Sequence, residues 1–129
     1  MGYYMTQRDT QFNIKQEKKE KALQAIKDIV NIDKIMSFSW VDMNFVNATT
    51  LKEAMDAWRW NIEEDDNGNV IGIYFEGEKL GDDGILFDAI APFVKSGSFI
   101  EMSGEDGCLW RWVFKRGKMT EKMANISWE

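Results

Sequence analysis

The clearest pattern in the chain is a strict alternation of aromatic and charged residues near its C-terminal end. Trp110, Trp112 and Phe114 fall on one side of the pattern. Arg111 and Lys115 fall on the other side. A period of two is typical of a strand with one buried and one solvated face. We therefore expect the aromatic residues to lie in the core and the two cations to face solvent.

This strand is predicted to be the second half of an antiparallel hairpin over Ser96–Lys118. A short apolar run precedes it, and the turn cluster Gly104–Gly107 separates the two runs. After the next turn the alternation resumes in Met119–Trp128, where the apolar positions are Ala124, Ile126 and Trp128. The pattern therefore predicts a three-stranded C-terminal meander, on which much of the remaining chain packs.

The segment Gln16–Val30 is the most regular helical pattern. Its apolar residues recur at helical spacing and form one stripe, while the other faces carry mostly charged residues. Asn31 is a plausible end for this helix. The apolar stripe consists of Ala22, Ile26 and Ile29, with Leu23 and Val30 beside them.

Two further helices are predicted from their start signals. Thr50–Glu53 has the form of a capping box, in which a hydroxyl and a carboxylate satisfy free N–H groups. The helix that it begins runs to about Trp58. A third helix covers about Asp83–Val94, and either Asp82 or Asp83 can cap it.

The remaining strand signals are shorter. Asn67-Gly68 is a strong hairpin signal, because both residues tolerate positive φ, and it separates Trp60–Glu64 from Val70–Glu76. In the second of these strands, Ile71, Ile73 and Phe75 alternate toward one face. Other strand candidates are Tyr3–Gln7 and Gln11–Ile14, which form either one bent strand or two, and Phe38–Val41.

This order of elements predicts an α+β fold. Residues 1–129 form a single two-layer domain, in which about three helices pack on an antiparallel sheet of the C-terminal meander plus a hairpin. A chain of this length, with 44% apolar residues, falls in the commonest size range of single domains and can bury a core without disulfides.

The charge balance limits the classes of partner. Sixteen basic and twenty-two acidic residues give a formal net charge of −6. Phosphate backbones repel such a chain, so direct nucleic-acid binding is disfavoured, and a protein partner with a basic surface fits better. We expect a cytoplasmic protein without membrane association, because no apolar run approaches the ~20 residues of a membrane span and the single Cys108 forms no internal disulfide.

The sequence lacks the residues that histidine-based catalysis requires. The chain has no histidine, which excludes histidine-based triads and general bases, and Cys108 has no imidazole to activate it. Four residues match positions of a calcium-binding EF-hand loop: Asp65, Asn67, Asn69 and Glu76. However, Val70 stands where that loop requires glycine, and the flanks read as strands. We therefore expect neither a metal site nor a cofactor.

Carboxylates cluster at three predicted turns or helix starts. They are Glu63–Asp66, Asp82–Asp83 and Glu105–Asp106. Each position favours acidic residues for local reasons. If two clusters met in space, they could form a glycosidase-like carboxylate pair or a Mg²⁺ site.

A possible interaction surface comprises both polar and aromatic residues. Arg111 and Lys115 share the solvated face of their strand, and Glu105 and Asp106 form the hairpin tip. Three tryptophans, Trp40, Trp60 and Trp128, have faces that the pattern fixes less well than those of Trp110 and Trp112, and we expect one or two of them to be partly exposed at an interface.

The run from Leu86 to Phe114, LFDAIAPFVKSGSFIEMSGEDGCLWRWVF, resembles a segment of small acidic uncharacterised proteins of bacteria and phages. The opening GYYMTQRDTQFNI and the closing ISW fit the same pattern. The resemblance implies a compact cytoplasmic protein and carries over no functional residue.

Three hypotheses about function follow. The first is a non-enzymatic accessory or inhibitor-type protein, of bacterial or phage origin, that occupies a basic surface on a protein partner. The second is a small-ligand-binding protein or carboxylate-based enzyme with a cleft among the acidic turns. The third is homo-oligomerisation through the edge of the C-terminal strand.

Overall fold

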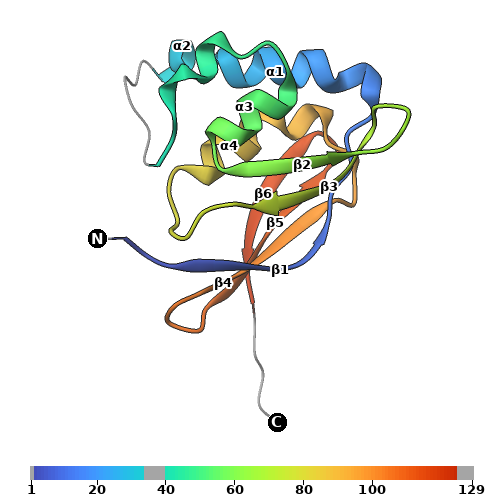
Figure 1. Ribbon diagram of the computed structural model, residues 1–129. Coiled ribbons are helices and arrows are strands. Elements are labelled where there is room, and N and C mark those ends of the chain that lie inside the picture. Colours follow the sequence, from blue (N-terminus) through green and yellow to red (C-terminus); the bar gives the residue numbers. More distant parts are fainter. Residues whose placement is uncertain (1, 34–39, 125–129) are drawn as a thin grey trace.

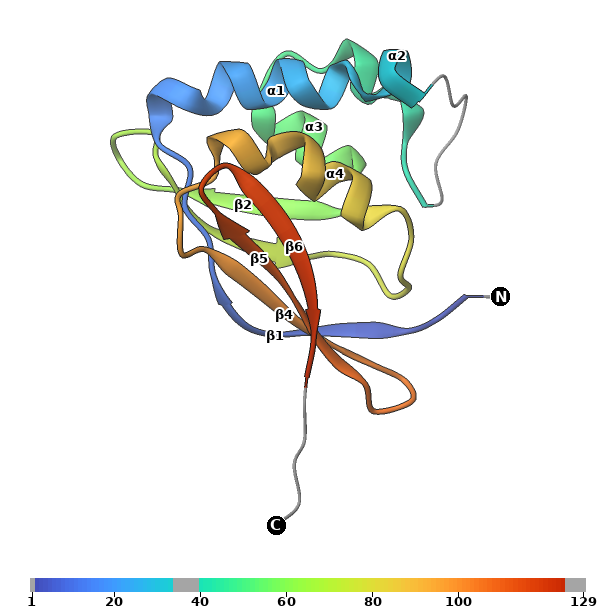
Figure 2. The same cartoon turned by 180° about the vertical axis from the view of Figure 1, so that it is seen from behind.

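The described residues of the computed structural model, 2–33 and 40–124, form two layers. Helices cover one face of a layer of antiparallel strands, and no helix covers the other face of the described strands (Figures 1 and 2). The predicted α+β class is therefore confirmed. The strands are β1 (Met5–Gln11), β2 (Trp60–Glu64), β3 (Val70–Phe75), β4 (Phe99–Gly104), β5 (Leu109–Lys115) and β6 (Lys118–Met123).

The helical layer contains α-helices and short 3-10 segments. The α-helices are α1 (Lys19–Lys27), α2 (Ile29–Asp33), α3 (Leu51–Ala57) and α4 (Asp83–Ile90). The 3-10 segments are η1 (Gln16–Lys18), η2 (Met43–Asn47) and η3 (Ala91–Phe93).

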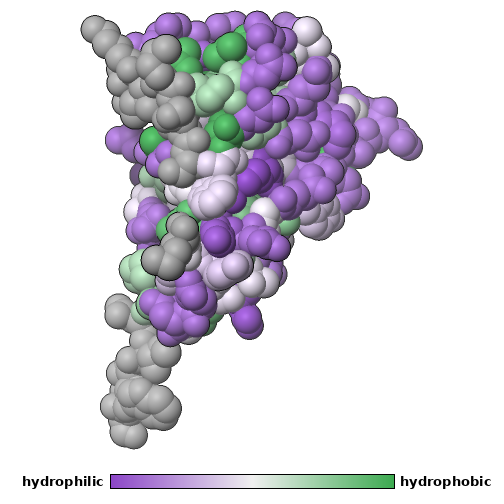
Figure 3. All heavy atoms as spheres, turned by 60° about the vertical axis from the view of Figure 1, so that its left-hand side comes forward, coloured by the Kyte–Doolittle hydropathy of each residue, from purple (hydrophilic) through white to green (hydrophobic). Residues whose placement is uncertain are grey.

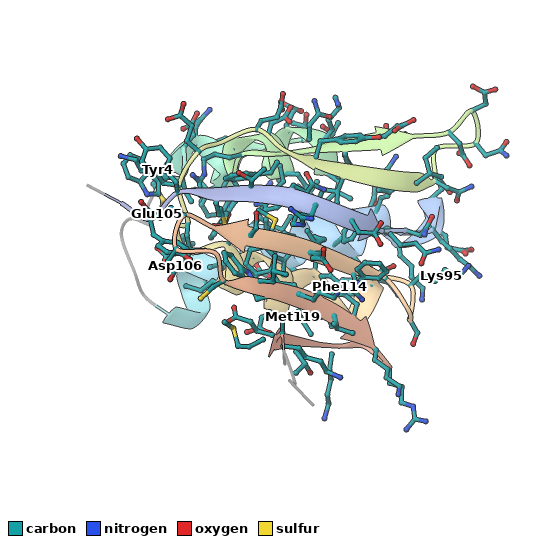
Figure 4. The ribbon with its side chains drawn as sticks, turned by 90° about the horizontal axis from the view of Figure 1, so that it is seen from below. Tyr4, Lys95, Glu105, Asp106, Phe114 and Met119 are labelled. Carbon is teal, nitrogen blue, oxygen red and sulfur yellow. The ribbon has the colours of Figure 1, made fainter. Side chains whose placement is uncertain are left out.

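The strands form two hydrogen-bonded sheets, ordered β1-β4-β5-β6 and β2-β3, that lie side by side (Figure 4). Gln7 joins them, because its side-chain amide donates to the carbonyl of Ile73 (2.8 Å) and accepts from the N–H of Phe75 (2.7 Å). This amide takes the place of a backbone peptide at the point where β1 bulges, between Gln7 and Thr10. The N-terminal segment is thus one bent strand.

The aromatic face of β5 is the centre of the core, as the alternation predicts. The exposed fractions of Trp110, Trp112 and Phe114 are only 6%, 1% and 0%. The Trp112 ring lies 5.0 Å from that of Phe87 in α4 and 6.0 Å from that of Trp60 in β2. Tilted and edge-on ring pairs of this kind add to the large area that each aromatic side chain buries.

The first helical region follows the predicted stripe but is not continuous. Ala22, Ile26 and Ile29 are buried. The helix breaks at Asp28, whose carbonyl accepts the shorter i+3 bond from the N–H of Asn31. Asn31 therefore does not end the region, because α2 continues to Asp33.

The capping box of α3 is confirmed in part. The Thr50 hydroxyl oxygen accepts from the Glu53 N–H (3.1 Å), as predicted. The Glu53 carboxylate accepts from the hydroxyls of Thr49 (2.7 Å) and Thr50 (3.2 Å). The prediction that Asp82 or Asp83 caps α4 is wrong. Asp82 makes no side-chain cap hydrogen bond, and the Asp83 side chain bonds to groups other than the free N–H groups of the helix start.

The β2–β3 hairpin is confirmed, but its turn differs from the prediction. Gly68 has positive φ (84°), whereas Asn67 does not, because the Asp65 carboxylate accepts from the Asn67 N–H (2.9 Å) and holds it in an Asx turn. Ile71, expected to face the core, is 46% exposed. A bulge opposite Glu63 and Glu64 leaves Ile71 without an opposing residue.

Two strand predictions reach beyond the described residues. Of the strand expected over Phe38–Val41, residues 38 and 39 lie outside them, and Trp40 lies in a turn rather than a strand. The third strand of the meander is confirmed as β6, although Ile126 and Trp128 also lie outside the described residues.

Candidate functional site

The structure separates the residues predicted to form an interaction surface. Arg111 and Lys115 are exposed on the face of β5 that points away from the helices. Glu105 and Asp106 lie in the β4–β5 turn, at the opposite end of β5 from Lys115. Figure 4 shows this turn at one end of the sheet and the loop at Lys95 at the other.

The prediction for Trp60 is wrong, because its side chain is fully buried. Its indole N–H donates to the Asp83 carboxylate (2.8 Å), which is only 1% exposed. The same carboxylate accepts from the Arg59 guanidinium (3.2 Å) and the Gly81 N–H (2.9 Å). Buried charges persist only when they are paired in this way. Trp60 and Asp83 therefore anchor α4 to β2, and neither belongs to a surface.

The β4–β5 turn packs on the N-terminal segment. The Tyr4 N–H donates to the Glu105 carboxylate (3.0 Å), and the Glu105 N–H donates to the Tyr4 carbonyl (2.9 Å). The Tyr3 hydroxyl donates to the Asp106 carboxylate. A Cβ at Gly104 would overlap the Tyr3 hydroxyl, so this contact requires glycine at the turn. The turn is therefore held in one position against two tyrosines.

The hydrogen bonds of this turn shift three pKa values. The Tyr3 hydroxyl and the Cys108 N–H both donate to Asp106 and lower the pKa of its carboxyl. The Asp106 carboxylate raises the pKa of Tyr3 to about 12. It also raises the pKa of the Cys108 thiol. At neutral pH Asp106 is thus a carboxylate, whereas Tyr3 and Cys108 keep their protons, so Cys108 is a poor nucleophile.

Exposed apolar side chains gather around this turn. Tyr4, Trp40, Leu80 and Met123 have exposed fractions of 49%, 50%, 37% and 59%. The Lys79 ammonium lies 5.0 Å from the centre of the Tyr4 ring and 5.5 Å from that of Trp40. We call the four apolar side chains the tip patch. Figure 3 looks onto this end, where pale side chains lie in the middle of a mostly hydrophilic face.

A small cavity opens between Leu80 and Met123. Its volume is about 180 Å³. Two aromatic rings, those of Tyr3 and Trp110, form part of its wall, and the Glu121 carboxylate is its charged member. The Glu121 carboxylate also accepts from the indole N–H of Trp112 (3.0 Å). A cavity of this size and lining can hold one side chain of a partner.

The backbone at Trp40 has an unusual conformation. Its φ is 63°, in the left-handed region that bulky residues rarely adopt. Such strain persists only where the surroundings impose it, and it is commonest at functional sites. Here it accompanies an indole ring that is half exposed.

Sequence reasoning missed most of the tip patch. The hairpin pattern indicated Glu105 and Asp106, but Tyr4 and Leu80 lie about 75 residues apart and come together only through the fold. The bonds that join them are a β-bridge between Tyr4 and Lys79 and the Leu80 N–H to the Tyr3 carbonyl (2.7 Å). Of the four residues, the sequence pattern indicated only Trp40, as one of three tryptophans with an unfixed face.

The acidic turns do not form a common cleft. Asp65 satisfies the N–H groups of its own turn, which lowers its pKa, and Asp83 is buried against Arg59. In residues 2–33 and 40–124, no group of three or more acidic, cysteine or histidine side chains is placed to hold a metal ion. The β2–β3 flanks of the Asp65 loop are strands, which agrees with a hairpin rather than an EF-hand.

Among the other depressions on the described residues, two have volumes above 300 Å³. One, of about 330 Å³, has Asp42, Glu53 and Asp56 in its wall. Asp42 caps η2 through the Asn44 N–H, and Glu53 accepts from two hydroxyls, so local turn structure explains both carboxylates. The other, of about 420 Å³, is the gap between β1 and β3 beside the bulge.

Comparison with protein-family models, with curated proteins and with solved structures finds no match. Among the described residues, no helix has the length and apolar character needed to cross a membrane.

Proposed function

We propose that this protein binds another protein with a basic surface, and that the tip patch is the contact site. The observation that carries the proposal is the gathering of apolar side chains at one end. Seven large hydrophobic side chains of the described residues are exposed, and four of them form the tip patch. A contiguous exposed apolar patch with a polar rim is typical of a protein interaction site.

The chemistry of the rim favours a basic partner. Carboxylates of Glu105, Asp106 and Glu121 lie beside the patch, as does the ammonium of Lys79. A lysine or arginine of the partner could lay its apolar stem against Trp110 and Met123 and its charge near Glu121. The net charge of −6 would also steer a basic partner toward this protein.

A non-catalytic role suits these groups. The Asp106 carboxylate is occupied by Tyr3 and Cys108, and its effect on their pKa values leaves both protonated. The alternative, a carboxylate-based enzyme or small-ligand-binding protein, has less support, because the acidic turns lie apart and the cavity at the tip patch is mainly apolar.

The test is affinity capture with a matched pair of double variants. The immobilised protein is exposed to a native lysate of its source at low and at high salt. The tip variant carries Trp40→Ala and Leu80→Ala. The control carries Val46→Ala and Ile71→Ala, which remove exposed apolar side chains outside the patch.

We expect the unmodified protein and the control to retain the same basic protein at low salt and to release it at high salt. The tip variant should retain at most about a tenth as much, since interface aromatics carry most of the binding energy. Retention by the tip variant equal to that by the control, or no retained protein, would contradict the proposal.

A further inference from the structure

The outer face of β5 and β6 places like charges opposite each other. Arg111 faces Lys122, and Lys115 faces Lys118, as directly opposed residues of the two strands. Opposed like charges destabilise a strand pair. The chain has more acidic than basic residues, so carboxylates could have stood opposite these cations. The requirements of folding alone therefore do not account for the like-charge pairs.

Further cations surround the same strands. Arg116 follows β5 in the β5–β6 turn, and the Ser96 hydroxyl accepts its N–H (3.4 Å), which brings the loop with exposed Lys95 alongside. A carboxylate on the outer face, that of Glu101, pairs with Arg111 (2.8 Å) and Arg8 (3.6 Å). This side of an acidic protein is therefore locally basic.

β6 is also an open edge of the sheet. It pairs only with β5, and in Figure 2 it lies in front, with no other described strand beyond it. The Ala124 N–H donates to the Leu109 carbonyl (2.9 Å). Because main-chain directions alternate along a strand, the N–H and C=O groups of Met119, Glu121 and Met123 point to the free edge.

We infer that β6 receives an extended acidic segment of a partner protein, which adds a strand to the sheet and places its carboxylates against Lys118 and Lys122. Strand addition satisfies the free main-chain groups, and the side chains supply specificity. Lysines also protect edge strands from unwanted pairing. That protection does not require cations at the opposing positions Arg111 and Lys115, whereas carboxylates set against Lys118 and Lys122 would relieve the repulsion within both opposed pairs.

A second copy of the chain fits this edge poorly. In antiparallel pairing, opposed residues share a face. Pairing centred on Thr120 places Lys118 opposite the second copy's Lys122, and pairing centred on Glu121 brings two carboxylates together. Homo-oligomerisation through β6, one of the hypotheses from the sequence, is therefore less favoured than an acidic partner.

The register defines a probe peptide. Lys118 and Lys122 lie four residues apart on one face, so the segment needs acidic residues four apart, with apolar residues opposite Met119 and Met123 and a basic residue opposite Glu121. A capped Val-Glu-Lys-Thr-Val-Glu peptide meets these conditions. In its N-methylated form, the backbone nitrogens of the lysine and of the second valine carry methyl groups. This form keeps the charges but loses these two N–H groups, which would bond β6.

The experiment is an NMR titration of the ¹⁵N-labelled full chain with each peptide. The variant carries Lys118→Glu and Lys122→Glu, and the matched control carries Lys18→Glu and Lys21→Glu, two exposed lysines of the helical layer. The probe should shift amide signals of β6 in the unmodified protein and the control. The charge-reversed variant and the N-methylated peptide should each bind at least about tenfold more weakly.

Three results would overturn the inference. They are no β6 shifts at millimolar peptide, equal binding of the N-methylated peptide, or equal binding by the charge-reversed variant. A single-stranded oligonucleotide is titrated in parallel. If it shifts the β6 signals and the peptide does not, the edge is a phosphate-binding surface, and strand addition is also overturned.

Discussion

Strand β5 has two neighbours, β4 and β6, and they place different charges opposite the cations of its outer face. On the β4 side, Arg111 lies opposite Glu101 and forms an ion pair of 2.8 Å. On the β6 side, the same Arg111 lies opposite Lys122, and Lys115 opposite Lys118. Opposite charges support the first pairing and like charges weaken the second. The charges on the outer face thus stabilise the β4–β5 pair and destabilise the β5–β6 pair, and the β5–β6 pair lies at the edge that is open to a partner.

The inner side chains of β5 and β6 differ in burial. Replacing Trp112 of β5 gives the largest expected effect on stability. Trp112→Ala should lower the free energy of unfolding by about 3–5 kcal/mol, because it empties the centre of the core. Met123→Ala on β6 should change it by at most about 0.5 kcal/mol, because that side chain is 59% exposed. Urea unfolding followed by circular dichroism measures both. Equal losses would remove the contrast between the strands.

A buried ion pair should matter more than the exposed pair of β4 and β5. Asp83→Ala leaves the Arg59 guanidinium and the Trp60 N–H without their partner, and should cost about 3–5 kcal/mol. Glu101→Gln breaks an exposed pair and should cost about 0.2–1 kcal/mol. The same unfolding assay compares them, and a larger loss for Glu101→Gln would contradict the ranking.

At the β4–β5 turn the expected effect is on titration. The hydrogen bond to Asp106 raises the pKa of Tyr3 to about 12, so its contribution to stability is complete below the ordinary value of about 10 and is lost as pH rises through about 12. The pKa of Asp106 is lowered, so its contribution is complete above about 4 and is lost as pH falls through the lowered pKa.

Absorbance titration of the tyrosines tests this link. In Asp106→Asn, Tyr3 should ionise at lower pH than in the unmodified protein, and Tyr3→Phe should remove the late phase near pH 12. Tyr74→Phe is the control, because the pKa of Tyr74 is raised by Glu63 in the separate β2–β3 sheet. An unchanged late phase in Tyr3→Phe would show that the turn is not held by this bond.

The fold followed closely from the sequence wherever a pattern was local. The alternation of β5, the stripe of α1 and the Asn67-Gly68 hairpin each depend on neighbours within a few residues, and each element forms. The predictions were wrong where residues distant in the sequence determine whether a side chain is buried. Trp60 is buried because Asp83, 23 residues away, accepts its N–H, and Ile71 is exposed because a bulge shifts the register.

The candidate surfaces were harder to predict for the same reason. Glu105, Asp106, Arg111 and Lys115 were identified as polar, but their roles depend on cross-strand neighbours. The pairing of Lys115 with Lys118 requires the β5–β6 register, and the tip patch requires Tyr4, Trp40 and Leu80 to meet from three segments. Composition suggested an acidic surface, whereas the fold gathers cations on one side of the sheet.

The most direct test of the central claim is the stability of the charge-reversed variant. Lys118→Glu with Lys122→Glu turns both like-charge pairs into opposite-charge pairs, and Lys18→Glu with Lys21→Glu is the control of equal net charge. Urea unfolding at low salt should show the charge-reversed variant more stable than the control, by about 0.2–1 kcal/mol for each pair. The difference should shrink in about 1 M salt, where the Debye length falls to about 3 Å. A charge-reversed variant no more stable than the control would contradict the claim that β6 gives up stability for binding.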